Sequence, residues 1–170
     1  ARVDSLPEDA KSVLQIGSVI EREFSFSLIK KVTHLPEREL LSHLSALRDS
    51  ELLYERGVFP QSTYVFRHAL TREVAYDSIL DSRKKALHEE IANAMEELFK
   101  DAIEEYYGVL AGHFFSSGNY RKAANYSQSA RKKSQKSALF NDAIEHAKMA
   151  VVCLEKLERT EAVLREIIDA

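Results

Sequence analysis

His68 is the side chain whose type and position are most suggestive of chemistry. It ends an alternating, strand-like run that begins at Tyr64, and a helical pattern starts directly after it. An imidazole at a junction between a strand and a helix can cap the helix or hydrogen-bond a nearby carbonyl. Residue types alone therefore favour a structural role for His68, and any functional role depends on the segment around it.

The motifs that would indicate catalysis are missing. There is no G-x-x-x-x-G-K-[ST] loop to hold phosphates, and the five glycines do not cluster. His34, His43 and His88 lack the partners and spacing of a zinc site. The acidic pairs at 96–97 and 104–105 are expected on solvated helix faces. We therefore expect no enzymatic activity, no metal and no cofactor in this chain itself.

A second candidate site is a basic run that contains no acid between positions 121 and 136. At helical spacing such a run forms a solvated face, or it provides a docking surface for an acidic partner or another domain. Its basic members are Arg121, Lys122, Arg131, Lys132, Lys133 and Lys136.

Composition is that of an ordinary globular protein. The chain has 170 residues, of which 45% are hydrophobic and 30% charged, and its net charge of −3 gives no general attraction to nucleic acid or acidic membranes. Cys153 lies in an apolar helical run, so we expect a small core residue in a reducing, cytoplasmic compartment. No segment reads as a membrane span or a signal peptide. The first residues and the helical pattern from Thr160 resemble cuts in a longer protein.

Residues 1–80 are predicted to form one domain. A helix starts around Ser5-Leu6-Pro7-Glu8, where residues 5 and 8 have the spacing of a capping box; a second has Ser25 as its cap, and a third opens at 35–37. Two strands, 52–56 and 63–67, flank a turn that contains Gly57 and Pro60. Three helices followed by a β-hairpin is the layout of a winged helix.

Residues 81–170 are predicted to be helical throughout, so the whole chain is mainly α. Gly118 is suited to a left-handed helix end. The pattern Gly118-x-Tyr120-x-x-Ala123 resembles a tetratricopeptide repeat, but its echo at Ala143 follows after 20 residues instead of ~34. We expect an antiparallel helical array with degenerate repeats, whose last apolar stripe is Ala143, Ile144, Ala147, Val151, Leu154 and Leu157.

The third helix would read DNA in a DNA-binding winged helix. Between positions 37 and 51 it carries four acids (Glu37, Glu39, Asp49, Glu51) against two bases (Arg38, Arg48). Phosphate contact requires Lys and Arg, so this balance disfavours DNA binding.

Several segments together resemble the region that follows the nucleotide-binding domain in bacterial signalling ATPases of the STAND class, including multidomain adenylate cyclases and ATPase transcriptional regulators. The resemblance covers most of the chain, from about Leu6 to Ala150, and is most specific between Phe66 and Tyr76. The matching segments are Leu6-Pro7-Glu8, Ile20-x-x-Glu23-Phe24, Leu52-Leu53-Tyr54-Glu55-Arg56, Phe66-Arg67-His68-Ala69-Leu70, Ala75-Tyr76 and Gly118 to Ala124.

The resemblance implies a role for His68. In several STAND relatives a Met-His-Asp motif at this place sets its His against the β-phosphate of bound ADP. His68 is similar in position and Leu70 matches the apolar residue that follows, while Arg67 replaces the Met and Ala69 the Asp. The implied nucleotide-sensing residues of the parent are thus His68 and Arg67, with ATP or ADP bound in the parent.

The function implied by the resemblance is regulation inside a larger nucleotide-switched ATPase. The winged helix would pack on an upstream nucleotide-binding domain, and the helical array would recognise an unknown protein partner. Two alternatives stay open: a DNA-binding winged-helix regulator, and an adaptor solenoid in which the winged helix is only a cap. The output domain, the stimulus, the partner and the oligomeric state are not encoded in these patterns.

Overall fold

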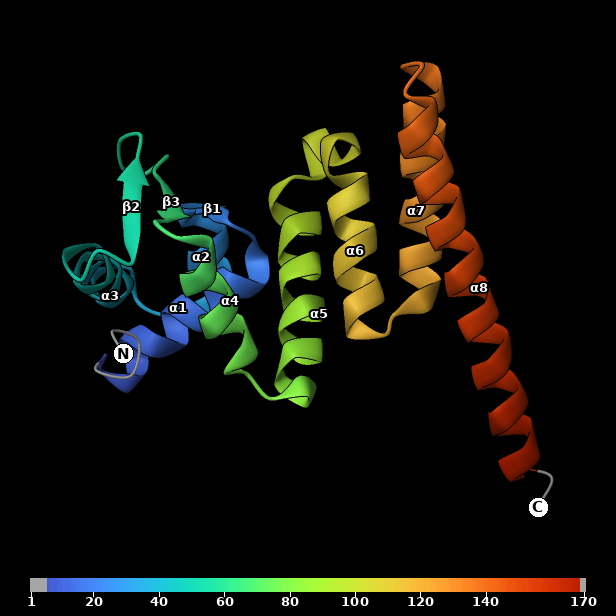
Figure 1. Ribbon diagram of the computed structural model, residues 1–170, viewed down its shortest axis with the longest axis horizontal. Helices are drawn as coiled ribbons and strands as arrows, with labels where there is room; N and C mark the ends of the chain where they lie inside the picture. Colours follow the sequence, from blue (N-terminus) through green and yellow to red (C-terminus); the bar gives the residue numbers. More distant parts are fainter. Residues whose placement is uncertain (1–5, 169–170) are drawn as a thin grey trace. The chain divides into compact units, whose positions relative to one another are not determined.

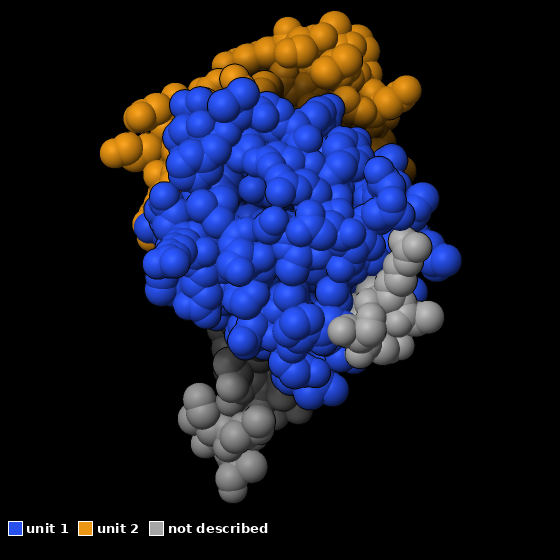
Figure 2. Space-filling model, turned by 90° about the vertical axis from the view of Figure 1, so that its left-hand side faces the viewer, with its two compact units in different colours: residues 1–94 blue, residues 95–170 orange. Residues whose placement is uncertain are grey.

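The chain is mainly helical and carries one small antiparallel sheet (Figure 1), which confirms the predicted fold class at this level. The computed structural model describes the backbone of residues 6–168 and the side chains of residues 6–159. Two compact units, residues 1–94 and 95–170, are drawn in different colours in Figure 2. The predicted boundary near Leu80 precedes helix α5 (Asp81–Leu98), whereas the units divide inside that helix.

The first unit follows the predicted order of three helices and a hairpin. Its elements are α1 (Glu8–Ile20), β1 (Glu23–Ser25), α2 (Phe26–Thr33), α3 (Glu37–Asp49), β2 (Leu53–Arg56), β3 (Thr63–Phe66), α4 (Ala69–Asp77) and the first part of α5. The two predicted strands are confirmed to within a residue. Strand β1 was not predicted, because three residues are too few to show an alternating pattern.

Strand β1 exists through its pairing with β3 rather than through its own pattern. The sheet order is β1-β3-β2, and Phe24 lies opposite Tyr64. The ring of Phe24 lies 6.0 Å from that of Tyr64 and 6.1 Å from that of Phe66. A Cβ on Gly17 of α1 would stand only 2.6 Å from the Phe24 ring. The missing side chain of Gly17 thus lets Phe24 approach α1 closely.

Helix ends agree with most of the predicted signals. The Ser25 hydroxyl accepts a hydrogen bond from the Leu28 N–H, as the cap prediction requires. Gly118 ends its helix with φ of 90°. Pro7 precedes α1 as its N-cap residue instead of lying in the first turn, and Ser5 of the predicted capping box lies outside the described residues.

The second unit is a row of antiparallel helices (Figure 1). After the end of α5 come η1 (Lys100–Tyr106), α6 (Tyr107–Ser117), α7 (Tyr120–Lys136) and α8 (Phe140–Ile168). Helix α7 packs against both α6 and α8. Small buried residues line these contacts, which lets the helices approach closely; they are Ala111, Ala123, Ala124, Ala130, Ala143 and Ala150.

The predicted apolar stripe of α8 is partly wrong. Ala143 is buried as expected, and Cys153 is also buried, which confirms it as a core residue. Ile144, Val151 and Leu154 are instead exposed. Helical spacing fixed their common side of α8, but α7 covers a different arc of the helix. No helix in the described part of the chain is both long and apolar enough to cross a membrane.

Candidate functional sites

His68 stands at the start of α4 with its side chain exposed. Its backbone is extended, at φ −130° and ψ 138°, and its carbonyl accepts from the N–H of Thr71 at 3.1 Å. The imidazole makes no capping hydrogen bond to the helix. The imidazole therefore does not cap the helix, although its residue type suggested that role.

Two apolar side chains are exposed on α4, the helix that starts directly after His68. Leu70 is 68% exposed and Val74 49% exposed, and their spacing of four residues places them on one helix face. A helix start also presents unpaired N–H groups and the positive end of the helix dipole. We call His68, Leu70 and Val74 the α4 surface. It combines a hydrogen-bonding imidazole with exposed apolar area.

Arg67 is adjacent in sequence but is held by a different neighbour. Its guanidinium lies 3.4 Å from a carboxylate oxygen of Glu51, and both side chains are largely exposed. Its backbone N–H donates to the Leu52 carbonyl at 3.0 Å, which ties the end of β3 to the start of the hairpin. An anion at this point would meet an arginine that already has a carboxylate partner.

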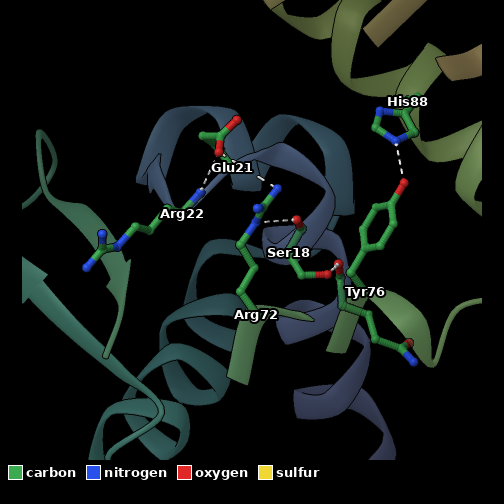
Figure 3. Close-up of polar contacts among 7 residues, drawn as sticks. Ser18, Glu21, Arg22, Arg72, Tyr76 and His88 are labelled. Atoms are coloured by element: carbon green, nitrogen blue, oxygen red, sulfur yellow. Dashed lines mark hydrogen bonds and ion pairs between the residues drawn. The ribbon is translucent and has the colours of Figure 1, made fainter. Parts of the chain in front are cut away.

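A polar cluster next to α4 was not found by sequence reasoning (Figure 3). The Tyr76 hydroxyl and His88 Nε2 lie 3.1 Å apart, and their rings meet edge to face. His88 is almost completely buried, and this burial lowers its pKa, with the charge of Arg72 lowering it further. Lys84 lies 4.7 Å from the Tyr76 ring centre. The neutral imidazole is therefore a packed structural group, and spacing alone carries no signal for it.

Arg72 ties α4 to the end of α1. Its Nε donates to the Ser18 carbonyl at 3.0 Å, and its Nη2 lies 3.8 Å from a carboxylate oxygen of Glu21 (Figure 3). A cation at the carboxyl end of a helix complements the exposed carbonyls and the helix dipole there. These contacts thus hold α4, which starts directly after His68, against α1.

The predicted basic surface is divided. On α7, Arg121, Lys132 and Lys136 are exposed at spacings of eleven and four residues, which places them on one face. Arg131 is half-buried on another side. Lys133 donates to the Glu104 carbonyl at 2.9 Å, so its ammonium is engaged within the unit.

Lys122 belongs to a polar cluster, which corrects the expectation that Glu96 lies on a solvated face. The Glu96 carboxylate accepts from Lys122 Nζ at 2.7 Å and from the Tyr126 hydroxyl at 2.6 Å. Lys122 Nζ also lies 4.5 Å from the Phe114 ring centre. Burial raises the pKa of Tyr126, and its bond to Glu96 raises it further. These groups hold the end of α5 to α7, and they cannot all serve an external partner.

A small cavity of about 240 Å³ opens beside α6, α7 and α8. Its polar lining includes Glu104, Glu105, Lys133 and His146, and the His146 ring lies so close to Gly108 that a Cβ there would stand 3.1 Å from it. Across the described residues, no three His, Cys, Asp or Glu side chains are grouped so that they could hold a metal ion. The lining carries both acidic and basic side chains, so it favours no single class of ligand.

No known protein family and no curated protein sequence matches this chain.

Proposed function

We propose that the chain is a regulatory, protein-interacting part of a larger nucleotide-switched signalling ATPase of the STAND class, with a winged-helix domain followed by a TPR-like array. The order of three helices and a hairpin supports the winged-helix assignment, and the stacked antiparallel helices support the array. The parent would bind ATP or ADP in an upstream domain, and its output could be a linked adenylate cyclase.

The observation that carries the proposal is the exposed His68 at the start of α4, a helix that also exposes Leu70 and Val74. Single exposed apolar residues are ordinary, but two on one face of a helix that begins with an exposed imidazole fit a domain contact. The apolar pair would pack against the nucleotide-binding domain. The imidazole would then donate a hydrogen bond to a phosphate oxygen of ADP.

In the mechanism that follows, ADP holds the winged helix on the nucleotide-binding domain and keeps the parent closed. Exchange for ATP breaks the contact with His68 and releases the winged helix. The helical array recognises a protein partner. A ligand shifts such an equilibrium only through contacts that differ between its two states, and the His68 contact would be present in the closed state alone.

The test uses His68→Ala in the parent and in this chain. We expect ADP to bind the parent on the order of ten- to a hundredfold more weakly, because a charge-assisted hydrogen bond contributes roughly 1.5–3 kcal/mol. The melting temperature of the chain should stay unchanged, since the side chain is exposed and caps nothing. A lower melting temperature with unchanged ADP affinity would show that His68 is purely structural.

A matched pair of variants tests the apolar part of the surface. Leu70→Glu should weaken docking of the chain on the isolated nucleotide-binding domain. Val58→Glu changes another exposed apolar residue, in the β2–β3 turn (80% exposed against 68% for Leu70), and should leave docking intact. Equal effects of the two variants would contradict the assignment of the α4 surface.

A further inference from the structure

Helix α7 has one exposed side that is polar along its whole length. Its residues recur every three or four positions, with one adjacent pair at the end of the helix, and they lie within ~100° of one another around the helix axis. None of them is acidic or apolar. We call this side the α7 strip, and it consists of Arg121, Asn125, Gln128, Lys132, Gln135 and Lys136.

Two cations of the strip have no ionic partner in the described part of the chain. The contacts between elements use other cations of α7: Lys122 pairs with Glu96, and Lys133 donates to a backbone carbonyl of η1. Neither Lys132 nor Lys136 forms an ion pair among the described residues. A cation in the last turn of a helix complements the helix dipole, which accounts for Lys136 but not for Lys132. Helix packing and the dipole therefore give no reason for the charge of Lys132.

Acids on neighbouring elements limit the positive surface to α7 itself. Helix α7 packs against η1 and α8. Near the C-terminal end of α7, η1 exposes Glu104 and Glu105, and the first turn of α8 exposes Asp142. A nucleic-acid duplex carries phosphates on two strands and would also approach these carboxylates. A single peptide segment can follow α7 alone, because packed helix axes lie about 8–10 Å apart. The distribution of charge therefore favours a narrow acidic partner.

The amide side chains of the strip suit the backbone of an extended peptide. Asn125, Gln128 and Gln135 can each donate and accept hydrogen bonds. An extended segment outside a sheet leaves its N–H and C=O groups unpaired, so it can use these amides, whereas a helix already pairs most of its own. The strip therefore fits an extended segment better than a helical one.

The spacing of the cations sets the spacing of the carboxylates that they can meet. At 1.5 Å per residue, Lys132 and Lys136 are ~6 Å apart along α7, and Arg121 is ~16 Å from Lys132. In an extended peptide, at ~3.3 Å per residue, these distances correspond to about two and about five residues. A segment with acids at those intervals can thus place one carboxylate on each cation.

We infer that the α7 strip binds an extended acidic segment of a protein partner, with carboxylates meeting Arg121, Lys132 and Lys136. The inference rests on the proposed function, in which the helical array recognises a protein, and it names the chemistry of that protein. Each ion pair is exposed and individually weak, so binding depends on several pairs together and decreases with added salt.

Nuclear magnetic resonance titration of the ¹⁵N-labelled 170-residue chain tests the surface. The probe is a synthetic octapeptide of serine and glycine with glutamate at its first, sixth and last positions. We expect it to shift the backbone resonances of α7 and the side-chain amides of Asn125 and Gln128, and to bind more weakly as salt is raised. The same peptide with glutamine in place of each glutamate should cause no shifts.

A matched pair of charge reversals locates the binding. Lys132→Glu should weaken binding of the acidic peptide on the order of tenfold, because it removes one attraction and adds one repulsion. Lys85→Glu makes the same change in net charge at another exposed lysine, on α5, and should change the affinity less than about twofold. Circular dichroism should show the same helix content in both variants, since both positions are exposed.

Three results would overturn the inference. They are an absence of shifts on α7 at about 1 mM peptide and low salt, equal weakening by Lys132→Glu and Lys85→Glu, and tighter binding of an oligothymidylate of the same length to the same residues, which would assign the strip to nucleic acid. The titration involves neither His68 nor a nucleotide. Its failure therefore leaves the ADP measurement on His68→Ala unaffected, and the two outcomes are distinguishable.

Discussion

His88 shows how one buried side chain can couple stability to pH. It is packed against Tyr76 and close to the charge of Arg72, and both burial and that charge disfavour the imidazolium. In the unfolded chain the imidazole has its ordinary pKa of about 6.5. Between that value and the lowered pKa of the folded state, the unfolded chain binds more protons.

The first prediction follows from this difference in proton binding between the unfolded and the folded chain. The free energy of unfolding should be at its full value above pH 6.5 and should fall as the pH drops below it, by at most about 1.4 kcal/mol per pH unit for this one group. Urea titrations at neutral and mildly acidic pH measure the loss. His88→Gln keeps a polar partner for Tyr76 but cannot be protonated, so its loss should be smaller. An equal loss in both proteins would assign the pH dependence to other groups.

The second prediction concerns Gly17, which packs closely against a buried ring. In Gly17→Ala the new Cβ would stand 2.6 Å from the buried Phe24 ring, which has no room to move within the sheet. Overpacking outweighs the better helix propensity of Ala, and we expect a loss of about 1–2 kcal/mol. Gly112→Ala in α6 is the matched control, because nothing lies within 4 Å of its Cβ. Thermal unfolding should show a lower melting temperature for the first variant and an equal or higher one for the second.

At the scale of elements, a few polar contacts fix helices to each other. Glu96 binds Lys122 and Tyr126 and so holds the end of α5 on α7. Arg72 does the same for α4 and α1. Both contacts are partly shielded from water, so their charges are screened less than those of surface pairs.

The third prediction compares two ion pairs of equal length. A double-mutant cycle with Glu96→Gln and Lys122→Met should give a coupling of about 1 kcal/mol, reduced from the buried value because these side chains are 27% and 40% exposed. The control cycle uses Glu145 and Lys148, also 2.7 Å apart but 71% and 65% exposed. Urea unfolding at low micromolar concentration should give it a coupling of a few tenths of a kcal/mol. Equal couplings would mean that burial does not strengthen the Glu96 contact.

At the scale of the molecule, charge decides which partners fit. The acidic third helix predicted from the sequence is α3, and two of its charged side chains pair with residues of neighbouring elements. Arg48 binds Glu55 at 2.8 Å, while Glu37 pairs with Lys30. A duplex approaching α3 would meet carboxylates and an arginine that is already paired.

The fourth prediction is that the chain does not bind duplex DNA with sequence specificity. Fluorescence anisotropy with mixed-sequence duplexes at physiological salt should give no submicromolar dissociation constant, because phosphate contacts supply most of the affinity in such complexes. Submicromolar binding that depends on sequence and is lost in Arg38→Ala or Arg48→Ala would favour the alternative of a DNA-binding regulator.

The sequence alone determined the order and type of most elements. Local signals are sufficient there: Ser25 accepts the expected capping bond, Gly118 takes the left-handed conformation, and the two hairpin strands lie on either side of the predicted turn. These features depend on neighbours within a few residues, which a sequence pattern records directly.

Only the tertiary structure decided which sides of these elements are covered. Periodicity places Ile144, Val151 and Leu154 on one side of α8 but cannot show that α7 packs on an adjacent arc. Strand β1 depends on β3, some forty residues later. His88, Glu96 and the uncapped imidazole of His68 likewise acquire or lack partners through contacts between elements. Contacts between distant residues depend on how whole elements pack, which no local pattern contains.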